Sequence, residues 1–482
     1  MPTNNKYEAV IGLEVHAQLL TNSKAFSTDA VEFGAEPNTD ISVITLGYPG
    51  TLPKLNKKVI ELAVKMGIAC HCDIRKYNKF ARKNYFYADL PKGYQISQHN
   101  TPLCTNGYID ITVNDQPKRI GLTRIHMEED SGKSTHDQDP YYTLIDLNRA
   151  GTGLIEIVSE PDMRSSDEAF AYLTEIRKIV RWLDICDGNM EEGSLRCDVN
   201  VSMRLKGAEK FGTKVEVKNM NSITNVKRAL EYEMERQAEA LEKGETIYQE
   251  TRNFDAATGK TVSMRTKEMA ADYRYFTEPD LPPVVLTEDY IEIIRKEMPA
   301  LPEEMKQNLV EKYTLSDYDA SQLTEDKLIA GFFLQLIKET KNYKAAANWI
   351  RGPIRAYLND SGTEIENFPL SPTTIADIIE LIDENKISFT SASQMVFPEL
   401  IKSSNKSVLD VVKQLNLLQE SDGSVLNEFI EQVVTKYPDK VAEYKNGKLG
   451  LLGFFMGEVM KLSKGKADPK LTTKLLKEKL DN

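Results

Sequence analysis

Glu14 and His16 are the first side chains in this sequence that could act together on one chemical group. They lie in a stretch, residues 7–19, where apolar and polar residues alternate, and a strand displays residues i and i+2 on the same face. A carboxylate and an imidazole that point the same way can bind one divalent ion. The same pattern is also typical of the solvated side of a half-buried strand, so the pair alone leaves both interpretations open.

Two later segments add carboxylates to this hypothesis. Alternation places Arg124, His126 and Glu128 on one side of a strand and Glu129 on the other. Glu156 is a single acid in an apolar stretch, and burying it is costly unless it is paired or bound to a cation. Separate salt bridges would explain each acid, whereas one magnesium site explains them jointly, because a hard cation prefers oxygen ligands. The predicted metal ligands are Glu14, His16, Glu128 and Glu156.

None of the usual nucleotide-binding motifs accompanies these acids. Gly132, Lys133 and Ser134 are similar to the end of a P-loop, but the first glycine of that motif would fall at Met127. No G-x-G-x-x-G stretch opens a predicted helix either. A bound ATP would therefore be held by a sheet face, through a metal and arginines.

The composition describes a soluble globular protein with several domains. The 482 residues have 41% hydrophobic content, a mean hydropathy of -0.42 and a formal net charge of -12. This length predicts roughly two to four domains. No apolar run approaches membrane-spanning length and the first residues lack the apolar core of a signal peptide, which favours the cytoplasm. The negative charge argues against indiscriminate nucleic-acid binding.

The five cysteines are too few and too scattered for a disulfide framework, and they fit a reducing compartment. Cys70, His71, Cys72 and Cys104 offer zinc ligands, but the usual C-x2-C spacing is missing and no fourth thiolate is evident. Zinc is therefore disfavoured.

The order of the predicted elements indicates an α+β protein. Residues 1–295 contain alternating strands with charged faces, and helices that begin at Ser165 and Ser222, where N-cap residues precede apolar residues at helical spacing. Residues 296–405 lose the strand alternation and are predicted to form short helices. Residues 406–482 form a further helical segment at the C-terminus.

This last segment has an excess of positive charge. Residues 440–482 carry ten lysines and five acids, a net +5, which suits RNA phosphates, although a solvated helical face explains the lysines as well. Gly450, Gly453 and Gly457 are costly inside a helix, which predicts the close approach of another element. The candidate RNA-binding residues are Lys461, Lys464, Lys466 and Lys470.

Longer motifs are spread in order over nearly the whole chain. They are GLEVH (12–16), RKNYFY (82–87), GYQIS (93–97), HMEED (126–130), DLNR (146–149), IEIVSEPD (155–162), MEEGSLRCD (190–198), KNMNS (218–222), DYRYF (272–276) and YKNGK (444–448). Together they resemble the B subunit of the bacterial and organellar aspartyl/glutamyl-tRNA amidotransferases. The resemblance implies a glutamine synthetase-like catalytic domain, a curved antiparallel sheet called the cradle, followed by an all-α helical domain and a small all-α tail that binds tRNA.

The activity implied by this resemblance is ATP-dependent amidation of misacylated Glu-tRNA(Gln), and it leaves Asp-tRNA(Asn) open as a second substrate. ATP would phosphorylate the side-chain carboxylate, and ammonia would then displace the phosphate. Mg²⁺, held by the four predicted ligands, would span the nucleotide phosphates. Glu129 would contact the incoming ammonia. Contacts to phosphate or to the acceptor end of the tRNA would come from Arg149, Arg196, Lys218, Arg265 and Arg274.

The resemblance also implies partner proteins. The chain shows no G-x-C-x-G nucleophile, begins with Met1 rather than a cysteine, and lacks a Gly/Ser-rich amidase stretch, so its ammonia has to come from elsewhere. The family obtains ammonia from its glutaminase, the A subunit, and a small C subunit completes the heterotrimer. Neither a membrane nor DNA is expected as a partner. A bacterial-type cytoplasm is favoured, and an organelle matrix stays open.

Two other functions stay open at this point. A stand-alone ATP-dependent ligase that joins small carboxylates to amines would need the same metal cluster but no basic tail. A non-catalytic tRNA-binding scaffold would need the tail but not the acids. Turnover of ATP and dependence on tRNA distinguish the three functions.

Overall fold

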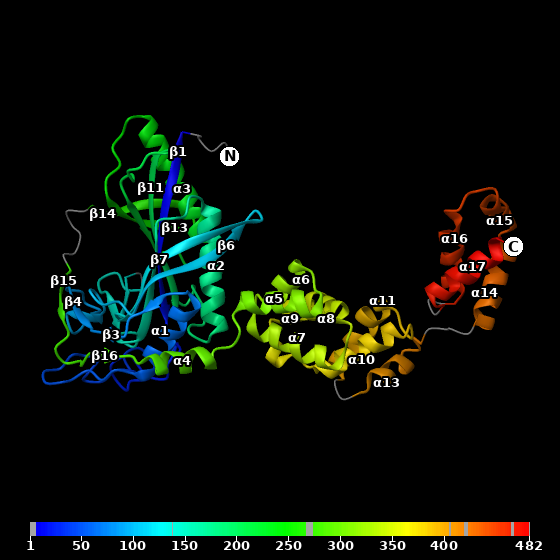
Figure 1. Ribbon diagram of the computed structural model, residues 1–482, viewed down its shortest axis with the longest axis horizontal. Coiled ribbons are helices and arrows are strands. Elements are labelled where there is room, and N and C mark those ends of the chain that lie inside the picture. Colours follow the sequence, from blue (N-terminus) through cyan, green and yellow to red (C-terminus); the bar gives the residue numbers. More distant parts are fainter. Residues whose placement is uncertain are drawn as a thin grey trace. The chain divides into compact units, whose positions relative to one another are not determined.

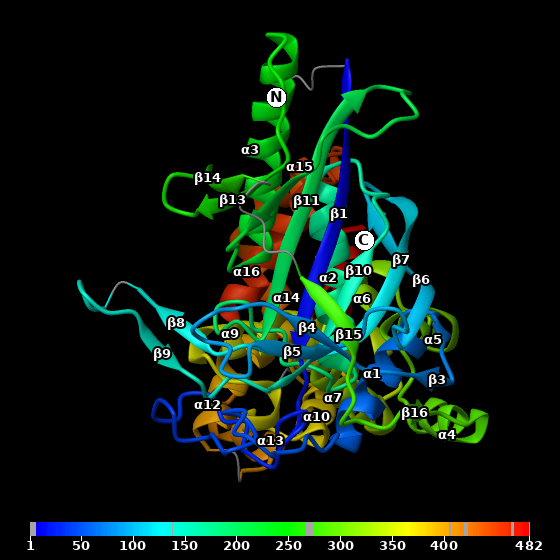
Figure 2. The same cartoon turned by 90° about the vertical axis from the view of Figure 1, so that its left-hand side faces the viewer.

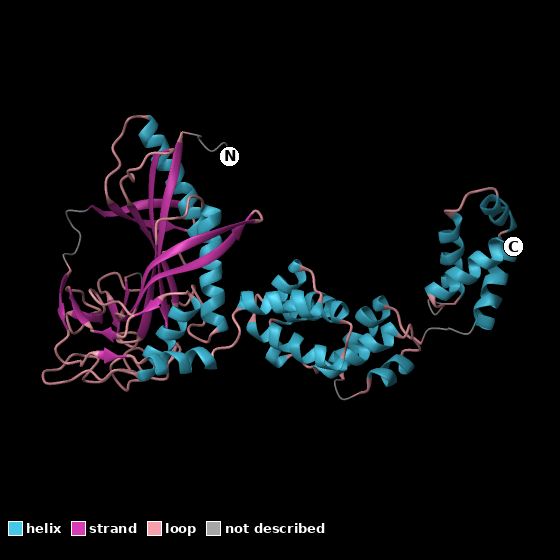
Figure 3. Ribbon diagram, viewed as in Figure 1, coloured by secondary structure: helices cyan, strands magenta, loops and turns pink. Residues whose placement is uncertain are grey.

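The computed structural model describes residues 6–136, 138–266, 273–403, 406–418, 423–463 and 467–481. The chain forms two compact units, Met1–Pro302 and Glu303–Asn482. In the described residues every strand belongs to the first unit, and the second unit is built from helices alone (Figure 1; Figure 3). The predicted α+β class is confirmed.

A large sheet forms the body of the first unit. Its described strands follow the order β14-β13-β12-β11-β1-β10-β7-β6-β2, and the pairs are antiparallel except β12–β13, which is parallel and departs from the purely antiparallel sheet that we expected. The strands are β1 (Tyr7–Gln18), β2 (Asp73–Ile74), β6 (Cys104–Val113), β7 (Gln116–Glu129), β10 (Gly153–Ser159), β11 (Leu195–Leu205), β12 (Val215–Lys218), β13 (Glu250–Asp255) and β14 (Lys260–Thr266).

One face of this sheet is apolar and is covered by helices. Ile11, Leu13 and Val15 of β1 are almost fully buried on it, as the alternation predicts. The covering helices are α1 (Lys57–Ala69), α2 (Ser166–Trp182) and α3 (Ile223–Glu242). The side chains of Ser165 and Ser222 accept hydrogen bonds from the first turns of α2 and α3, so both predicted helix starts are confirmed.

The other face of the sheet carries the polar side chains, and a smaller sheet lies across part of it (Figure 2). Its order is β15-β4-β5, and hydrogen bonds from β5 to residues of β7 fasten it to the large sheet. The short strands are β3 (Tyr77–Asn78), β4 (Ala81–Asn84), β5 (Tyr94–Ser97), β8 (Lys133–Thr135), β9 (Leu144–Asp146), β15 (Arg274–Thr277) and β16 (Val284–Val285), and helix α4 (Glu288–Glu297) follows them.

The second unit has two separate apolar cores. The first includes the fully buried Trp349 and Phe333, and the second includes Phe455 and Leu476. The helices are α5 (Pro302–Tyr313), α6 (Asp317–Leu323), α7 (Lys327–Glu339), α8 (Tyr343–Trp349), α9 (Arg355–Ser361), α10 (Pro372–Asp383), α11 (Phe389–Ser391), α12 (Phe397–Lys402), α13 (Val408–Gln414), α14 (Gly423–Lys436), α15 (Pro438–Lys445), α16 (Leu451–Leu462) and α17 (Pro469–Asp481). None of the helices in the described ranges combines the length and apolar character needed to cross a membrane.

Candidate active site on the polar face of the sheet

The polar face gathers residues that are far apart in the sequence. Strand pairing sets Arg196, His16, Glu156 and His126 directly opposite one another on β11, β1, β10 and β7. Directly opposite residues of antiparallel strands share a face, and neighbouring strands lie about 4.8 Å apart. The row therefore presents two imidazoles, a carboxylate and a guanidinium side by side.

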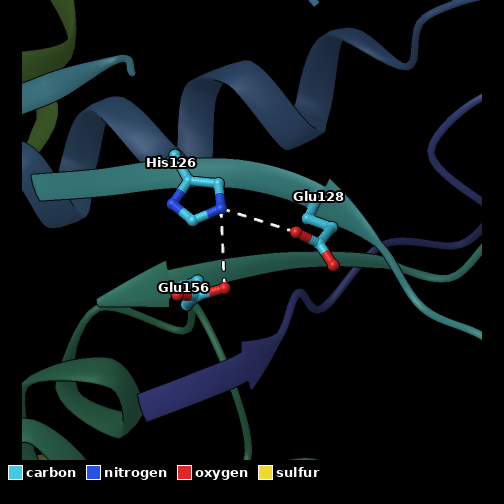
Figure 4. Close-up of side chains that lie close together, drawn as sticks. All are labelled: His126, Glu128 and Glu156. Carbon is cyan, nitrogen blue, oxygen red and sulfur yellow. Dashed lines mark ion pairs between the residues drawn. The ribbon is translucent and has the colours of Figure 1, made fainter. Parts of the chain in front are cut away.

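Two of these side chains, His126 and Glu156, form a tight buried group with Glu128 (Figure 4). The His126 Nε2 atom lies 3.4 Å from Glu128 Oε2 and 3.5 Å from Glu156 Oε2. His16 Nε2 lies 3.3 Å from the same oxygen of Glu156. One ligand atom each of His126, Glu128 and Glu156 falls within 4.8 Å of the others, and these residues are only 2%, 4% and 7% exposed. Within the described residues this is the one group of three or more acidic, histidine or cysteine ligands with such spacing.

Neighbouring charges keep both carboxylates of the group ionised. Burial works against the charge of Glu128, but Lys83, whose Nζ lies 3.4 Å away, and His126 outweigh burial and lower the pKa of Glu128. Burial likewise opposes the charge of Glu156, and His126 and His16 reverse its effect, so the pKa of Glu156 falls well below its usual range. Two buried carboxylates therefore stand charged at neutral pH, as a cation site requires.

Of the four predicted metal ligands, Glu128 and Glu156 belong to this group and His16 contacts it through Glu156, whereas Glu14 lies outside it. Glu14 lies on the same face, one row from His16, and its Oε1 accepts a hydrogen bond of 2.8 Å from Asn200 Nδ2. It is not part of the tight group. His126 takes that place and was absent from our predicted set, although the alternation of β7 had already put it on the same side as Glu128.

Glu129 contacts a different set of residues, as its opposite position on the strand predicts. Its Oε1 accepts a 2.8 Å hydrogen bond from the backbone N–H of Ile96 and pairs with the Lys92 ammonium. It lines a pocket of about 140 Å³ together with Lys92, Arg82 and Tyr94. Polar and charged groups line this pocket, so it can admit a small polar molecule.

Two of the predicted cationic residues meet at a single buried acid. Arg196 Nη2 lies 2.9 Å from Asp130 Oδ2, and Arg149 Nε lies 3.7 Å from the same atom. Arg149 also donates hydrogen bonds to the carbonyl oxygens of Ser131 and Gly132. Sequence reasoning gave Asp130 no role, since a carboxylate after a strand end carries no periodic signal.

The other predicted cations lie apart from this pair. Lys218 Nζ contacts Asp198 at 2.6 Å and Glu216 at 3.1 Å, and these acids, against the effect of burial, raise its pKa. Arg274 is exposed on β15. Arg265 pairs with Thr251 through its backbone, but its side chain lies outside the described residues.

Comparisons of this sequence with known proteins identify its family. Residues 9–292 match the GatB/GatE catalytic domain, and residues 331–480 match the GatB domain. Relatives named as the B subunit of aspartyl/glutamyl-tRNA(Asn/Gln) amidotransferase are similar over nearly their full length. The one from Persephonella marina is 51% identical over 476 residues, 98% of this chain and 100% of the relative. Those from Caldicellulosiruptor bescii and Thermodesulfovibrio yellowstonii are each 50% identical, covering 99% and 98% of both chains.

The chain belongs to the B-subunit family of the aspartyl/glutamyl-tRNA(Asn/Gln) amidotransferases. Its predicted RNA-binding lysines fall inside the stretch that matches the GatB domain. Lys461 and Lys470 are exposed, in α16 and α17, whereas Lys464 and Lys466 lie outside the described residues.

The three glycines at the start of and within α16 lack the close neighbour that the sequence predicted. A Cβ atom built on Gly450, Gly453 or Gly457 would meet no neighbouring atom within 4 Å in the described structure. Another helix does not pack closely against these glycines there, so the expectation of a close approach was wrong for the described chain.

The cysteines of this family member are free thiols. Burial raises the pKa of the Cys70 and Cys197 thiols. The exposed His71 ring stacks on Tyr108 with centroids 4.4 Å apart. Cys70, Cys72 and Cys104 do not form a ligand group of the kind found around His126 among the described residues.

Proposed function

We propose that this chain is the amidating subunit of a tRNA-dependent amidotransferase. It phosphorylates the side-chain carboxylate of misacylated Glu-tRNA(Gln) with ATP and lets ammonia displace the phosphate, which leaves Gln-tRNA(Gln). Asp-tRNA(Asn) is amidated in the same way where the cell misacylates that tRNA. The observation that carries the proposal is the buried group of His126, Glu128 and Glu156 on the polar face of the sheet, in a chain whose full-length relatives are named amidotransferase B subunits.

The group suits a divalent cation. Its two close N···O contacts, 3.4 and 3.5 Å, fall between the distances expected for adjacent and opposite ligands about 2.1 Å from one Mg²⁺ ion. The His126 Nδ1 atom is buried and has no hydrogen-bond partner in the described structure, so the contacts of this ring with the group are made through Nε2. We assign Mg²⁺ to His16, His126, Glu128 and Glu156, with Glu14 one row away, and we expect no zinc. When bound, the ion neutralises charge on the nucleotide phosphates.

The chain's own side chains do the remaining work. A carboxylate does not react with ammonia near neutral pH until one of its oxygens becomes a good leaving group, which is why phosphorylation comes first. Charge that develops during phosphoryl transfer is offset by cations that are already in place. We assign this role to Arg149, Arg196, Lys218, Arg265 and Arg274.

Glu129 is suited to hold ammonia. Its carboxylate lines the small polar pocket and accepts N–H donors already, as its contact with Ile96 demonstrates. An ammonia molecule that donates one N–H to this carboxylate keeps its nitrogen lone pair free to attack the acyl phosphate. The proton released on attack can pass to the same carboxylate.

Ammonia comes from a partner in this proposal. We assign glutamine hydrolysis to a glutaminase, the A subunit, and expect a small C subunit in the same heterotrimer, since the sequence contains no recognisable glutaminase nucleophile. We further propose that residues 1–295 carry the chemistry, that 296–405 form a helical domain, and that 406–482 bind tRNA through Lys461, Lys464, Lys466 and Lys470.

The test is Glu128→Gln in the complete complex. The substitution keeps the volume but removes the charge of a predicted metal ligand, so we expect amidation of Glu-tRNA(Gln) to fall about 100-fold while the partner's glutaminase activity stays intact. Mn²⁺ binding to the full chain, followed by electron paramagnetic resonance, should weaken in parallel. Glu160→Gln is the matched control, because Glu160 is an exposed acid that contacts Thr123.

Three results would contradict the proposal. Unchanged amidation by the Glu128→Gln complex would remove the acid from the reaction. Amidation of free glutamate without tRNA would favour a small-molecule ligase. A complex that binds charged tRNA but does not consume ATP would favour a scaffold.

A further inference from the structure

Arg124 lies on the polar face next to the proposed metal site, and neither our predictions nor the comparisons assign it a role. It is two residues from His126 on β7, so the two side chains share a face. Its strand partners are Val158 on β10 and Thr105 on β6. Glu14, the closest acid in its own row, is on the far side of Val158.

The guanidinium of Arg124 differs from the cations around it. Lys83 contacts Glu128, Arg196 contacts Asp130 and Lys218 contacts Asp198. No hydrogen bond or ion pair of the Arg124 side chain is found in the described part of the chain, and its Nε–H is buried without an acceptor.

An unpaired donor on a buried nitrogen is costly, because it has lost its water without gaining a partner. Most of this cost disappears when an external acceptor binds. The guanidinium is a planar fork of N–H donors that matches two oxygens of a phosphate. Its neighbour, the buried carboxylate group, repels anions unless a cation is present, so an anion would bind here together with that cation.

We propose that Arg124 binds phosphate oxygens of the substrate that sits over the metal group. The proposal rests on the proposed function, in which ATP phosphates and the tRNA acceptor end both enter this face. Both sources offer the same chemistry, a phosphate oxyanion. ATP is the favoured source, because its terminal phosphates are the ones that the adjacent cation bridges.

The first experiment measures nucleotide binding without turnover. A non-hydrolysable ATP analogue with Mg²⁺ is titrated into the full chain by calorimetry, and AMP is titrated in parallel. We expect Arg124→Gln to weaken binding of the ATP analogue about 10- to 100-fold and to leave AMP binding unchanged. Arg124→Lys should lie between the variant and the wild type, because lysine keeps the charge but not the fork.

Arg119→Gln is the matched control. Arg119 is on the same strand, five residues before Arg124, but it is exposed and pairs with Asp110. Arg119→Gln removes the same charge as Arg124→Gln. If both variants weakened binding of the ATP analogue equally, only overall charge would matter, and the assignment would be overturned. Thermal unfolding of each variant shows whether it is folded.

The second experiment uses the complete complex and measures KM for Glu-tRNA(Gln). A raised KM for tRNA, with nucleotide affinity unchanged, would place the bound phosphate on the tRNA and would still support the assignment. Unchanged constants in both experiments would overturn it, and so would equal weakening of the ATP analogue and AMP. A wild-type complex that binds nucleotide through Arg124 but does not amidate tRNA would overturn the proposed function and leave the role of Arg124 standing.

Discussion

Replacing Asp130 with asparagine should both destabilise the first unit and slow amidation. Asp130 is 4% exposed, and its Oδ2 contacts Arg196 at 2.9 Å and accepts a 2.8 Å hydrogen bond from Gln18 Nε2. Burial opposes its charge, but Arg196 and Arg149 reverse that effect and lower the pKa of Asp130. The carboxylate therefore holds two cations of the proposed site in place.

The size of the effect follows from how exposed the partners are. Breaking a fully buried ion pair costs about 3–5 kcal/mol, and an exposed pair contributes about 0–1 kcal/mol. The Arg196 side chain is 31% exposed, so water recovers part of the loss. Asparagine keeps one acceptor oxygen but removes the charge. We expect the free energy of unfolding of the first unit to fall by about 2 kcal/mol, and the amidation rate by about 10-fold as Arg149 and Arg196 move.

The pH dependence gives the prediction a sign. The folded pKa of Asp130 is depressed, so its stabilisation is present above the unfolded pKa of about 3.9 and is lost as the pH falls through the folded pKa. The difference in stability between wild type and Asp130→Asn should therefore be constant around neutral pH and should shrink below about pH 4.

Urea unfolding followed by tryptophan fluorescence can measure this change in the first unit alone. The chain has two tryptophans, and Trp182 is in the first unit, buried and donating its Nε1–H to the carbonyl of Ala300. In a Trp349→Phe background the signal reports that unit. Stability within about 0.5 kcal/mol of wild type at neutral pH would refute the reasoning, because effects of that size are typical of surface substitutions.

Two further predictions concern lysines. Burial lowers the pKa of Lys24 to about 8, below its unfolded value of about 10.4. The free energy of unfolding of the wild type should therefore rise by about 3 kcal/mol between these two pH values. Lys24→Met should lack this rise, and Lys57→Met, a control at an exposed lysine, should keep it. Urea unfolding at pH 8 and pH 10 checks this, and parallel curves for wild type and Lys24→Met would contradict it. Replacing Lys461 and Lys470 with alanine should reduce the slope of log tRNA affinity against log salt concentration by about 0.7 to 0.9 per lysine, as measured in filter-binding titrations. Lys386→Ala is the control. A slope equal to that of the control would argue against phosphate contacts.

Local patterns in the sequence predicted the elements well. The period-two alternation of β1 put Glu14 and His16 on the polar face and Ile11 on the buried one, because a strand turns successive side chains to opposite faces. N-cap chemistry located the start of α2 at Ser165, because the hydroxyl satisfies a backbone N–H that the helix leaves unpaired.

Patterns failed where the answer depended on other parts of the chain. The glycines of α16 suggested a packed neighbour, but a glycine spacing does not say whether its face meets protein or open space. The short strand β5 contributes the Ser97 hydroxyl that donates to Glu128, and four residues are too few to show a period. The roles of Asp130 and Arg124 depend on which partners each one has, and partners are not written in local order.

The sequence by itself determined the α+β class, the family and the face on which each strand residue lies, since these follow from side-chain period and from long motifs. The tertiary structure alone decided which residues meet. Register across β11, β1, β10 and β7 brings Arg196, His16, Glu156 and His126 into one row, although up to 180 positions separate them in the chain. Register is a property of pairs of strands, set by hydrogen bonds between distant segments, so no single segment specifies it.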